Sequence, residues 1–396
     1  MRPLLLLLAP LLPLLALMMV RAGDGHAAGA TPPTTPPRIG PTPVDLPSTS
    51  MILCPLLPGK QQGNIDKVAY SPDGRALLAS GGDFVRLFDP GSGRPLAAYK
   101  PGGFQDNGAL AYSPDGRALL APCAPRRLAL LEPATGRPVR GLDPPPAPEP
   151  RWAAAAAYSP DGRAVAGSFG NGEVPLWDAA TGRLTHVLPA HIIPAHPAGP
   201  NNPYIQPAAP VPVLSLAFSP DGATLYGSSR RLLRAWDVAG GRERPMDRPD
   251  GCYFGGLAVS PDGATLAVGQ AHQAEGAKAR TYSIALWDAA TGRRKTELAA
   301  EAWALALAYL PGGRSLVTVD DQQVVRLWDL ATGRPVAAAR FDPFYEFGPG
   351  SNASSLAVSP DGRQVAIGGS GSGSGSILGV VGLVEVDGQK LGPWKP

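Results

Sequence analysis

Short runs of apolar residues alternate with clusters of glycine, proline and polar residues along most of the chain. Val68–Tyr70 and Leu216–Phe218 each precede such a cluster, and Thr265–Ala267 follows one. The runs have the length of β-strands and are bounded by turn-forming residues, as strands are. The pattern therefore predicts an all-β protein built from many short strands.

One turn sequence, Ser-Pro-Asp-Gly, recurs between these runs. Its proline presets φ at the second turn position, its aspartate tolerates the third, and its glycine accepts positive φ at the fourth. The tetrapeptide thus predicts a hairpin loop built around a type I turn with a bulge. Its prolines are 42, 46, 60, 41, 50 and 49 residues apart, a period that indicates propeller blades. Six copies begin at Ser71, Ser113, Ser159, Ser219, Ser260 and Ser359, and Leu310–Gly313 is a degenerate seventh.

A second landmark, an aromatic or apolar residue followed by an acidic one, comes after every hairpin except the last in the chain, which begins at Ser359. A glycine turn such as Ala180–Arg183 or Ala290–Arg293 follows it, and a further short apolar run completes the repeat. Each repeat is therefore predicted to contain four strands. The landmark pairs are Phe88-Asp89, Leu131-Glu132, Trp177-Asp178, Trp236-Asp237, Trp287-Asp288 and Trp328-Asp329.

Four strands per repeat, the Ser-Pro-Asp-Gly hairpin and the Trp-Asp pair together resemble the WD-repeat family over roughly residues 51–390. The resemblance implies a seven-bladed β-propeller of four-stranded antiparallel blades, which we assign to residues 51–391. The Gly-His dipeptide of that family is absent from the repeats, and the last repeat has Val384-Glu385 in place of Trp-Asp. The resemblance also implies structural roles, with each tryptophan packed between neighbouring sheets, for Trp177, Asp178, Trp236, Asp237, Trp287, Asp288, Trp328 and Asp329.

A propeller must close its ring, because an exposed strand edge invites aggregation. The apolar segment Met51–Leu56 precedes the first repeat, and we predict that it supplies the outer strand of the seventh blade beside residues 382–386. The alternative is that Lys390–Trp394 closes its own blade. Residues 392–396 are assigned to a short tail.

The first 30 residues have the composition of an export signal. Arg2 precedes a leucine-rich apolar run over residues 3–20, and Ala28-Gly29-Ala30 fits a cleavage site. The alternative is a retained membrane anchor, since 18 apolar residues could barely span a bilayer. Residues 31–50 are rich in proline and threonine and are assigned to a disordered linker. We therefore expect a secreted, periplasmic or envelope protein.

Length variation is confined to one side of the predicted ring. The Ser-Pro-Asp-Gly and Ala-Thr-Gly-Arg turns fall on one face, whereas the long, variable loops fall on the other. Insertions on one face of a repeat array commonly mark a binding surface. Aromatic residues and arginines, which dominate interface hot spots, gather in these loops. Candidate binding residues are Phe104, Trp152, Tyr204, Tyr253, Phe254, Trp303, Phe344, Tyr345, Phe347, Arg126, Arg127 and Arg230, which Arg231 could join. The alternative is that single aromatics pack beneath their own loops.

These features favour a non-catalytic scaffold, a monomeric propeller that binds a protein or peptide partner; a purely structural envelope component is the second non-enzymatic reading. No nucleic-acid partner is expected, because the formal net charge is only +3 and the basic residues are scattered. We expect no cofactor and no metal. Two histidines, His191 and His196, share a proline-rich loop without a common face, and no cysteine pair has CxxC spacing.

The alternative function is a periplasmic propeller enzyme. A quinone-dependent dehydrogenase is suggested by the Asp288–Gly292 turn, but the tryptophan that follows such turns in those enzymes is missing here. A hydrolase with a metal in the central channel would need convergent carboxylates or histidines, and the aspartates of this chain fall mainly in turns.

Overall fold

The computed structural model of the chain divides into two compact units, residues 1–37 and residues 38–396. The structure describes residues 39–46, 51–53, 65–81, 84–100, 109–123, 127–143, 145, 152–189, 192–193, 209–247, 249, 251–273, 279–341, 352–373 and 376–393. Every regular element in these ranges is a β-strand. The all-β prediction is confirmed.

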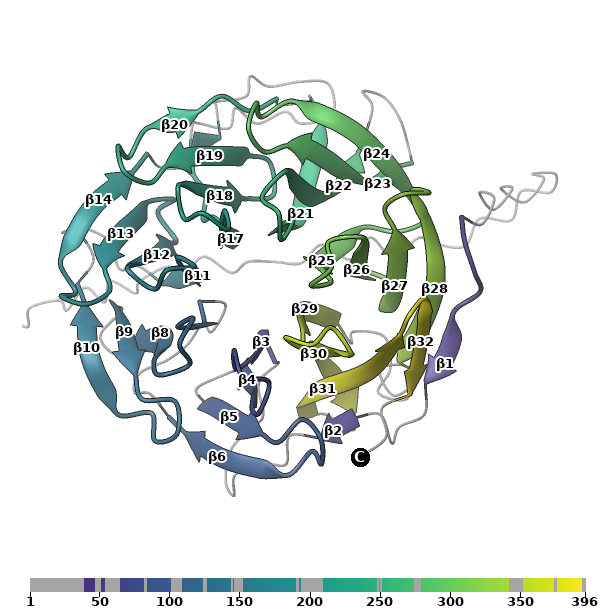
Figure 1. The fold of residues 1–396 in the computed structure, drawn as a ribbon, viewed down its shortest axis with the longest axis horizontal. Helices are drawn as coiled ribbons and strands as arrows, with labels where there is room; N and C mark the ends of the chain where they lie inside the picture. Colours follow the sequence, from purple (N-terminus) through teal and green to yellow (C-terminus); the bar gives the residue numbers. More distant parts are fainter. Residues whose placement is uncertain are drawn as a thin grey trace, which may run out of the picture. The chain divides into compact units, whose positions relative to one another are not determined.

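Seven sheets stand side by side in a ring and form a seven-bladed β-propeller (Figure 1). In each blade the strands follow chain order from the innermost, A, to the outermost, D. Blade 1 consists of β3 (Lys67–Tyr70), β4 (Leu77–Gly81), β5 (Phe84–Phe88) and β6 (Pro95–Tyr99). Blade 2 consists of β7 (Ala111–Tyr112), β8 (Leu119–Cys123), β9 (Arg127–Leu131) and β10 (Pro138–Leu142). Blade 3 consists of β11 (Ala153–Tyr158), β12 (Ala164–Phe169), β13 (Val174–Asp178) and β14 (Leu184–Leu188). Blade 4 consists of β17 (Ser215–Phe218), β18 (Thr224–Ser228), β19 (Leu233–Asp237) and β20 (Glu243–Arg244).

The last three blades continue the same antiparallel order. Blade 5 consists of β21 (Cys252–Val259), β22 (Thr265–His272), β23 (Thr281–Asp288) and β24 (Arg294–Ala300). Blade 6 consists of β25 (Ala304–Tyr309), β26 (Ser315–Asp320), β27 (Val324–Asp329) and β28 (Arg334–Phe341). The first three strands of blade 7 are β29 (Asn352–Val358), β30 (Gln364–Gly373) and β31 (Ser376–Asp387). The predicted architecture of seven four-stranded blades is confirmed.

The Ser-Pro-Asp-Gly turns join strands A and B and share one geometry. In blade 1, Gly74 has a φ of 70°, and its N–H donates to the carbonyl of Ser71 at 2.9 Å. The Ser71 hydroxyl donates to Asp73 Oδ1 at 2.6 Å and accepts the N–H of Ala76 at 2.9 Å. Such a φ is favourable for glycine alone among common residues. The glycine of the repeat is thus required by the turn.

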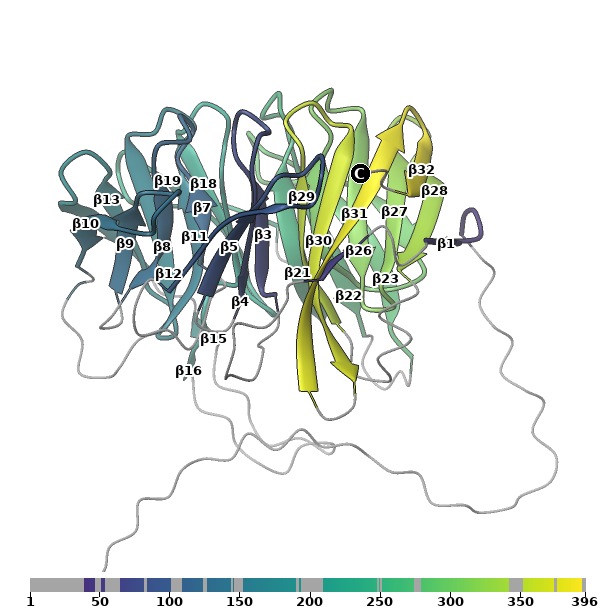
Figure 2. The same cartoon turned by 90° about the horizontal axis from the view of Figure 1, so that it is seen from below.

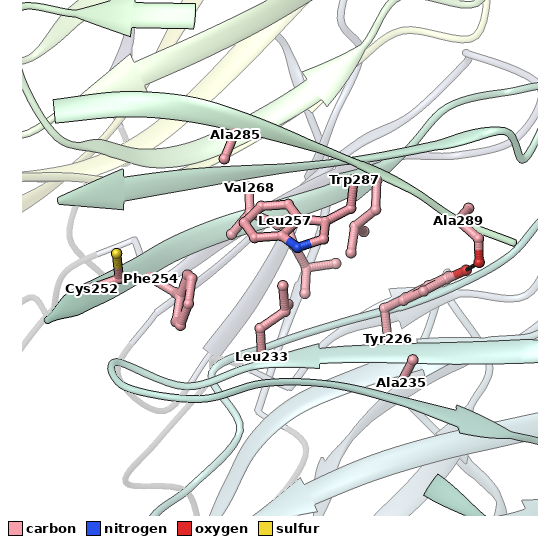
Figure 3. Packing of buried hydrophobic residues seen from close by; sticks show 11 residues of the cluster. Tyr226, Leu233, Ala235, Cys252, Phe254, Leu257, Val268, Ala285, Trp287 and Ala289 are labelled. Atoms are coloured by element: carbon pink, nitrogen blue, oxygen red, sulfur yellow. Dashed lines mark hydrogen bonds between the residues drawn. The ribbon is translucent and has the colours of Figure 1, made fainter. Parts of the chain in front are cut away.

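The core consists of seven apolar clusters, each shared by two neighbouring blades. The cluster between blades 7 and 1 packs Phe88 against Ala366 and Leu383, so the ring is closed. The four tryptophans of the Trp-Asp pairs are fully buried, each against the preceding blade. Figure 3 shows Trp287 of blade 5 beside Leu233 and Tyr226 of blade 4. These indoles join the sheets to one another.

Both ends of the propeller contribute to the outer strand of blade 7. On one half of β31, β2 (Met51–Leu53) pairs antiparallel, with Ile52 opposite Val381. On the other half, β32 (Lys390–Pro393) pairs with the same strand. The two closures that the sequence offered as alternatives therefore coexist. Strand β32 also runs two residues past the predicted limit of the propeller, into the range assigned to the tail.

An additional strand lies outside blade 6. Strand β1 (Val44–Leu46) pairs parallel with β28, which makes this blade five-stranded. The N–H of Ile39 donates to a carboxylate oxygen of Glu301 at 2.6 Å. The assignment of residues 31–50 to a disordered linker therefore does not hold for Val44–Leu46. A strand edge accepts such a segment through backbone groups alone, so no apolar pattern is needed.

Glycine- and serine-rich residues at the end of β30 form a regular ladder with β31 in the structure. Strands β30 and β31 continue pairing to Gly373 and Ser376. Figure 2 shows this hairpin protruding from the ring on the side where β15 (Ile192–Ile193) and β16 (Ala209–Pro210) lie. Backbone hydrogen bonds suffice to form it, which explains why the composition did not predict it.

Candidate functional site

The two faces of the ring differ in regularity (Figure 2). One face, the short-turn face, carries the turns between strands A and B and between strands C and D. The other, the long-loop face, carries the loops between strands B and C and the crossovers to the next blade. The β30–β31 hairpin and the β15–β16 ladder belong to the long-loop face. Irregular structure is thus concentrated on one side.

Carboxylates of the short-turn face are engaged in their own turns. The hydroxyl of Ser71 and the N–H of Arg75 donate to Asp73 and lower the pKa of its carboxyl group. At a turn between strands C and D, the N–H and hydroxyl of Thr291 bond to Asp288, and Lys295 Nζ lies 3.0 Å from its other oxygen. These contacts lower the pKa of Asp288 to about 2. This face presents carboxylates that are already satisfied.

Half of the binding residues proposed from the sequence are placed by the structure. Tyr253 and Phe254 lie on β21, Trp303 precedes β25, and Arg230 lies between β18 and β19. Trp152 and Arg127 lie on blades 3 and 2. The remaining six lie outside the described residues: Phe104, Tyr204, Phe344, Tyr345, Phe347 and Arg126.

Arginines of blades 4 and 5 gather around Tyr253 on the long-loop face. The guanidinium carbon of Arg231 lies 5.3 Å from the centre of the Tyr253 ring, and that of Arg280 lies 5.1 Å from it. Both distances allow a cation–π interaction. Arg231 also donates to the Tyr253 hydroxyl at 3.4 Å, and the carbonyl of Arg230 accepts the N–H of Phe254 at 3.0 Å. We call Arg230, Arg231, Tyr253 and Arg280 the Arg–Tyr corner.

Arg280 was not among the sequence candidates. It stands directly before β23 at the end of a long loop, and an isolated arginine in a loop carries no pattern that separates it from others. Its Nε donates to Gln273 at 3.2 Å, across the same loop. Only the hairpin of β22 and β23 brings Arg280 to Tyr253.

Trp303 sits beside the corner, in the crossover from blade 5 to blade 6. The backbone N–H of Trp303 donates to Asp321 Oδ1 at 3.2 Å. Its indole Nε1 is buried without an acceptor among the described residues. The indole lies against Gly255 of β21, where a methyl group would come within 3.1 Å of Nε1. Glycine at this position therefore lets the innermost strands of two blades approach closely.

Phe254 does not belong to a surface patch. Its side chain is 4% exposed and makes an edge-to-face contact with Trp287, at 6.3 Å between ring centres. Successive side chains on a strand point to opposite sides, so Tyr253 and Phe254 cannot both face outward. The alternative given for single aromatics, packing beneath their own loops, describes Phe254.

Trp152 and Arg127 make contacts of their own within other blades. Trp152 is 43% exposed, and its indole covers Gly170 in blade 3. Arg127 forms an ion pair with Asp143, with 3.0 Å between nitrogen and oxygen. The described contacts do not link either residue to the Arg–Tyr corner.

A cavity of about 430 Å³ opens in blade 5 beside the crossover from blade 4. Gln270 and Cys252 are buried in its lining, and Gln270 Nε2 contacts the Cys252 sulfur. Cys252 is buried and Cys123 is half-buried, while Cys54 lies outside the described residues.

Groups suited to catalysis are sparse in the part of the chain that the structure describes. No three His, Cys, Asp or Glu residues there gather closely enough to hold a metal ion. Burial lowers the pKa of Lys67 on β3 and raises that of Tyr70, which precedes a short turn. No contact between these two side chains is observed. In the same ranges no helix is long and apolar enough to cross a membrane.

Comparison with known proteins identifies one repeat directly. Residues 206–237, which include all of β17, β18 and β19, match the family model for the WD domain, G-beta repeat. A stretch of 54 residues is 41% identical to the nuclear distribution protein PAC1-2 of Uncinocarpus reesii (strain UAMH 1704). That stretch is 14% of this chain and 12% of the relative, so the chain matches only a small part of that protein's length. The propeller therefore contains a WD repeat in its fourth blade.

Proposed function

We propose that this protein is an exported, non-catalytic scaffold that recognises a protein or peptide partner on its long-loop face. The observation that carries this proposal is the inequality of the two faces. The short-turn face repeats one set of turns whose side chains hydrogen-bond within the turn itself. The long-loop face holds the variable crossovers and the Arg–Tyr corner. Arginine and tyrosine are the side chains most enriched at interface hot spots.

The WD repeat at residues 206–237 supports a scaffold, because propellers of this type generally serve to bind proteins. A nuclear distribution protein is similar over part of the chain, and nothing in that printed name describes a reaction. Binding by this chain would use the Arg–Tyr corner, whose side chains already contact one another, and this keeps the entropic cost of association low.

Export is part of the proposal and rests on residues 1–30. An apolar run after Arg2, followed by small residues, is typical of a signal segment. Cell fractionation combined with intact-mass measurement tests it. We expect the protein in the envelope or the medium, with a mass reduced by the signal segment. Full-length protein in the cytoplasm would contradict export and would leave the scaffold proposal untouched.

Affinity capture with matched variants tests the binding face. The Tyr253→Ala, Trp303→Ala double variant alters the long-loop face. The Arg117→Ala, Arg163→Ala variant alters exposed residues of the short-turn face. We expect the first variant to lose the captured partner and the second to retain it, with both variants still showing a cooperative melting transition above the assay temperature. Loss of capture in the short-turn variant alone would place the binding surface on the other side.

A further inference from the structure

Three arginines of the Arg–Tyr corner stand apart from the other charged residues of the propeller. Arg230, Arg231 and Arg280 are exposed, and none forms an ion pair within the described ranges. On the short-turn face, by contrast, arginines such as Arg75 and Arg163 lie beside the aspartate of their own turn. Among the described residues, the corner thus concentrates positive charge without an ion-pair partner.

The guanidinium groups are held in place but keep free donors. Arg231 uses one N–H for the Tyr253 hydroxyl, and Arg280 uses its Nε for Gln273. A guanidinium has five N–H donors, so most of them remain available to an acceptor from outside. Stacking against the tyrosine ring reduces the rotamer freedom that either arginine would lose on binding. The corner is therefore preorganised for anionic groups.

We propose that the Arg–Tyr corner binds an acidic peptide segment of a partner protein, through its Asp or Glu carboxylates. This inference rests on the proposed function and names the chemistry of its partner. Guanidinium groups pair with carboxylates in charge-assisted, often bidentate, hydrogen bonds. The guanidinium carbons of Arg231 and Arg280 lie 5.3 Å and 5.1 Å from the centre of the Tyr253 ring, so the sum of these two distances is the upper limit of their separation. Alternate side chains of an extended peptide, roughly 7 Å apart, fall within that upper limit.

Other occupants fit the corner less well. Asp321 lies in the neighbouring loop of blade 6, is exposed and interacts electrostatically with Arg280, so it limits the positive patch on that side, whereas a nucleic acid binds along an extended basic surface. The N-terminal 38 residues of this chain contain one acidic residue, Asp24, and are not a source of an acidic segment. In a second copy, the aspartates of the Ser-Pro-Asp-Gly turns are already hydrogen-bonded and are therefore weaker acceptors for the arginines.

Fluorescence anisotropy with the full chain tests the proposal. The probe is a labelled octapeptide with glutamate at alternate positions, and its control has glutamine at those positions. We expect the glutamate peptide alone to bind, with an affinity that falls as salt rises. In Arg231→Gln, Arg280→Gln the affinity should drop roughly tenfold, since two charge-assisted hydrogen bonds are lost. In Arg117→Gln, Arg163→Gln, which removes the same charge from the opposite face, it should change less than about twofold.

Several outcomes would overturn this inference. They are equal losses in the two double variants, equal binding of the glutamine peptide, or tighter binding of a phosphopeptide or a single-stranded oligonucleotide of the same charge. Self-association of the protein, measured by light scattering, that the corner variant abolishes would assign the surface to a second copy. If capture of a partner still depends on Tyr253 and Trp303 while the acidic peptide fails, the proposed function stands and this inference falls.

Discussion

Arg86 and Arg326 occupy the same place in their blades, two residues before Phe88 and Trp328. Arg326 is 6% exposed and pairs with Asp320 and Glu301. Arg86 is 5% exposed, yet both of its terminal nitrogens lack a partner among the described residues, and its nearest ring is that of Phe84 at 4.6 Å. A buried charge without a counter-ion costs free energy, whereas a paired one is roughly balanced. At the same position of the repeat, the buried charge of Arg326 is balanced by carboxylates in blade 6, whereas that of Arg86 in blade 1 has no partner among the described residues.

Replacement of these arginines by methionine should separate the two cases. Arg326→Met leaves the carboxylate of Asp320 buried without its partner and should lower the free energy of unfolding by about 3–5 kcal/mol. Arg86→Met removes an unpaired charge and should leave that free energy unchanged or raise it by about 1 kcal/mol. Urea unfolding at neutral pH measures both. Equal destabilisation by the two substitutions would contradict this account.

The turn aspartates predict an acid limit to stability. Hydrogen bonds from serine lower the folded pKa of Asp73, Asp115 and Asp161, and contacts with Thr291 and Lys295 bring that of Asp288 to about 2. A depressed folded pKa gives stability that is complete above the unfolded pKa of about 4 and is lost as the pH falls through the folded value. We expect the melting temperature to be flat above about pH 5 and to fall steadily between about pH 4 and pH 2. Ser71→Ala should flatten that fall; an unchanged slope would contradict the assignment.

At the residue scale, the sequence predicted the repeat positions better than the exposed ones. The glycines of the tetrapeptide follow from a local rule, because each turn requires positive φ. Phe254 and Tyr253 could not be separated in this way, since their assignment depends on which side of β21 faces blade 4. Arg280 joined the corner only through the pairing of β22 with β23.

At the element scale, strands bounded by turn residues were predictable and strands held by backbone pairing alone were not. Ser-Pro-Asp-Gly predicted the hairpins of strands A and B, and Trp-Asp marked the end of strand C. Strand β1 has only three residues in a proline-rich segment, and the end of β30 contains only glycine and serine, so neither could be identified as a strand from its sequence. Their stability comes from hydrogen bonds to an edge that the fold had already provided.

The divided outer strand of blade 7 gives a prediction at this scale. Removal of residues 1–56 deletes β2 together with β1 of blade 6, so it is compared with removal of residues 1–46, which deletes β1 alone. Removal of residues 390–396 deletes β32, and loss of β2 or of β32 exposes half of the β31 edge. We expect each truncation to lower the melting temperature by several degrees, and the double truncation to lower it further, because the two segments pair with different residues of β31. Differential scanning calorimetry checks this. An N-terminal truncation that melts like the intact chain would show that β2 does not hold the ring closed.

At the scale of the whole molecule, closure makes every blade dependent on its neighbours. Each apolar cluster belongs to two blades, and the cluster between blades 7 and 1 completes the circle. The regular turns then fix the ring on one side and leave the loops of the other side free to vary. The number and order of blades followed from the repeat, whereas the partner did not, because binding depends on loops that no repeat specifies.

Site-specific photo-crosslinking in the source cells tests the central claim, that this ring binds a partner through its long-loop face. A photoreactive amino acid is placed at Arg231 of the long-loop face or at Arg117 of the short-turn face, and the adducts are compared by mass spectrometry. We predict a discrete protein adduct from position 231 and none from position 117. An adduct from position 117 alone would contradict the assignment of the binding face.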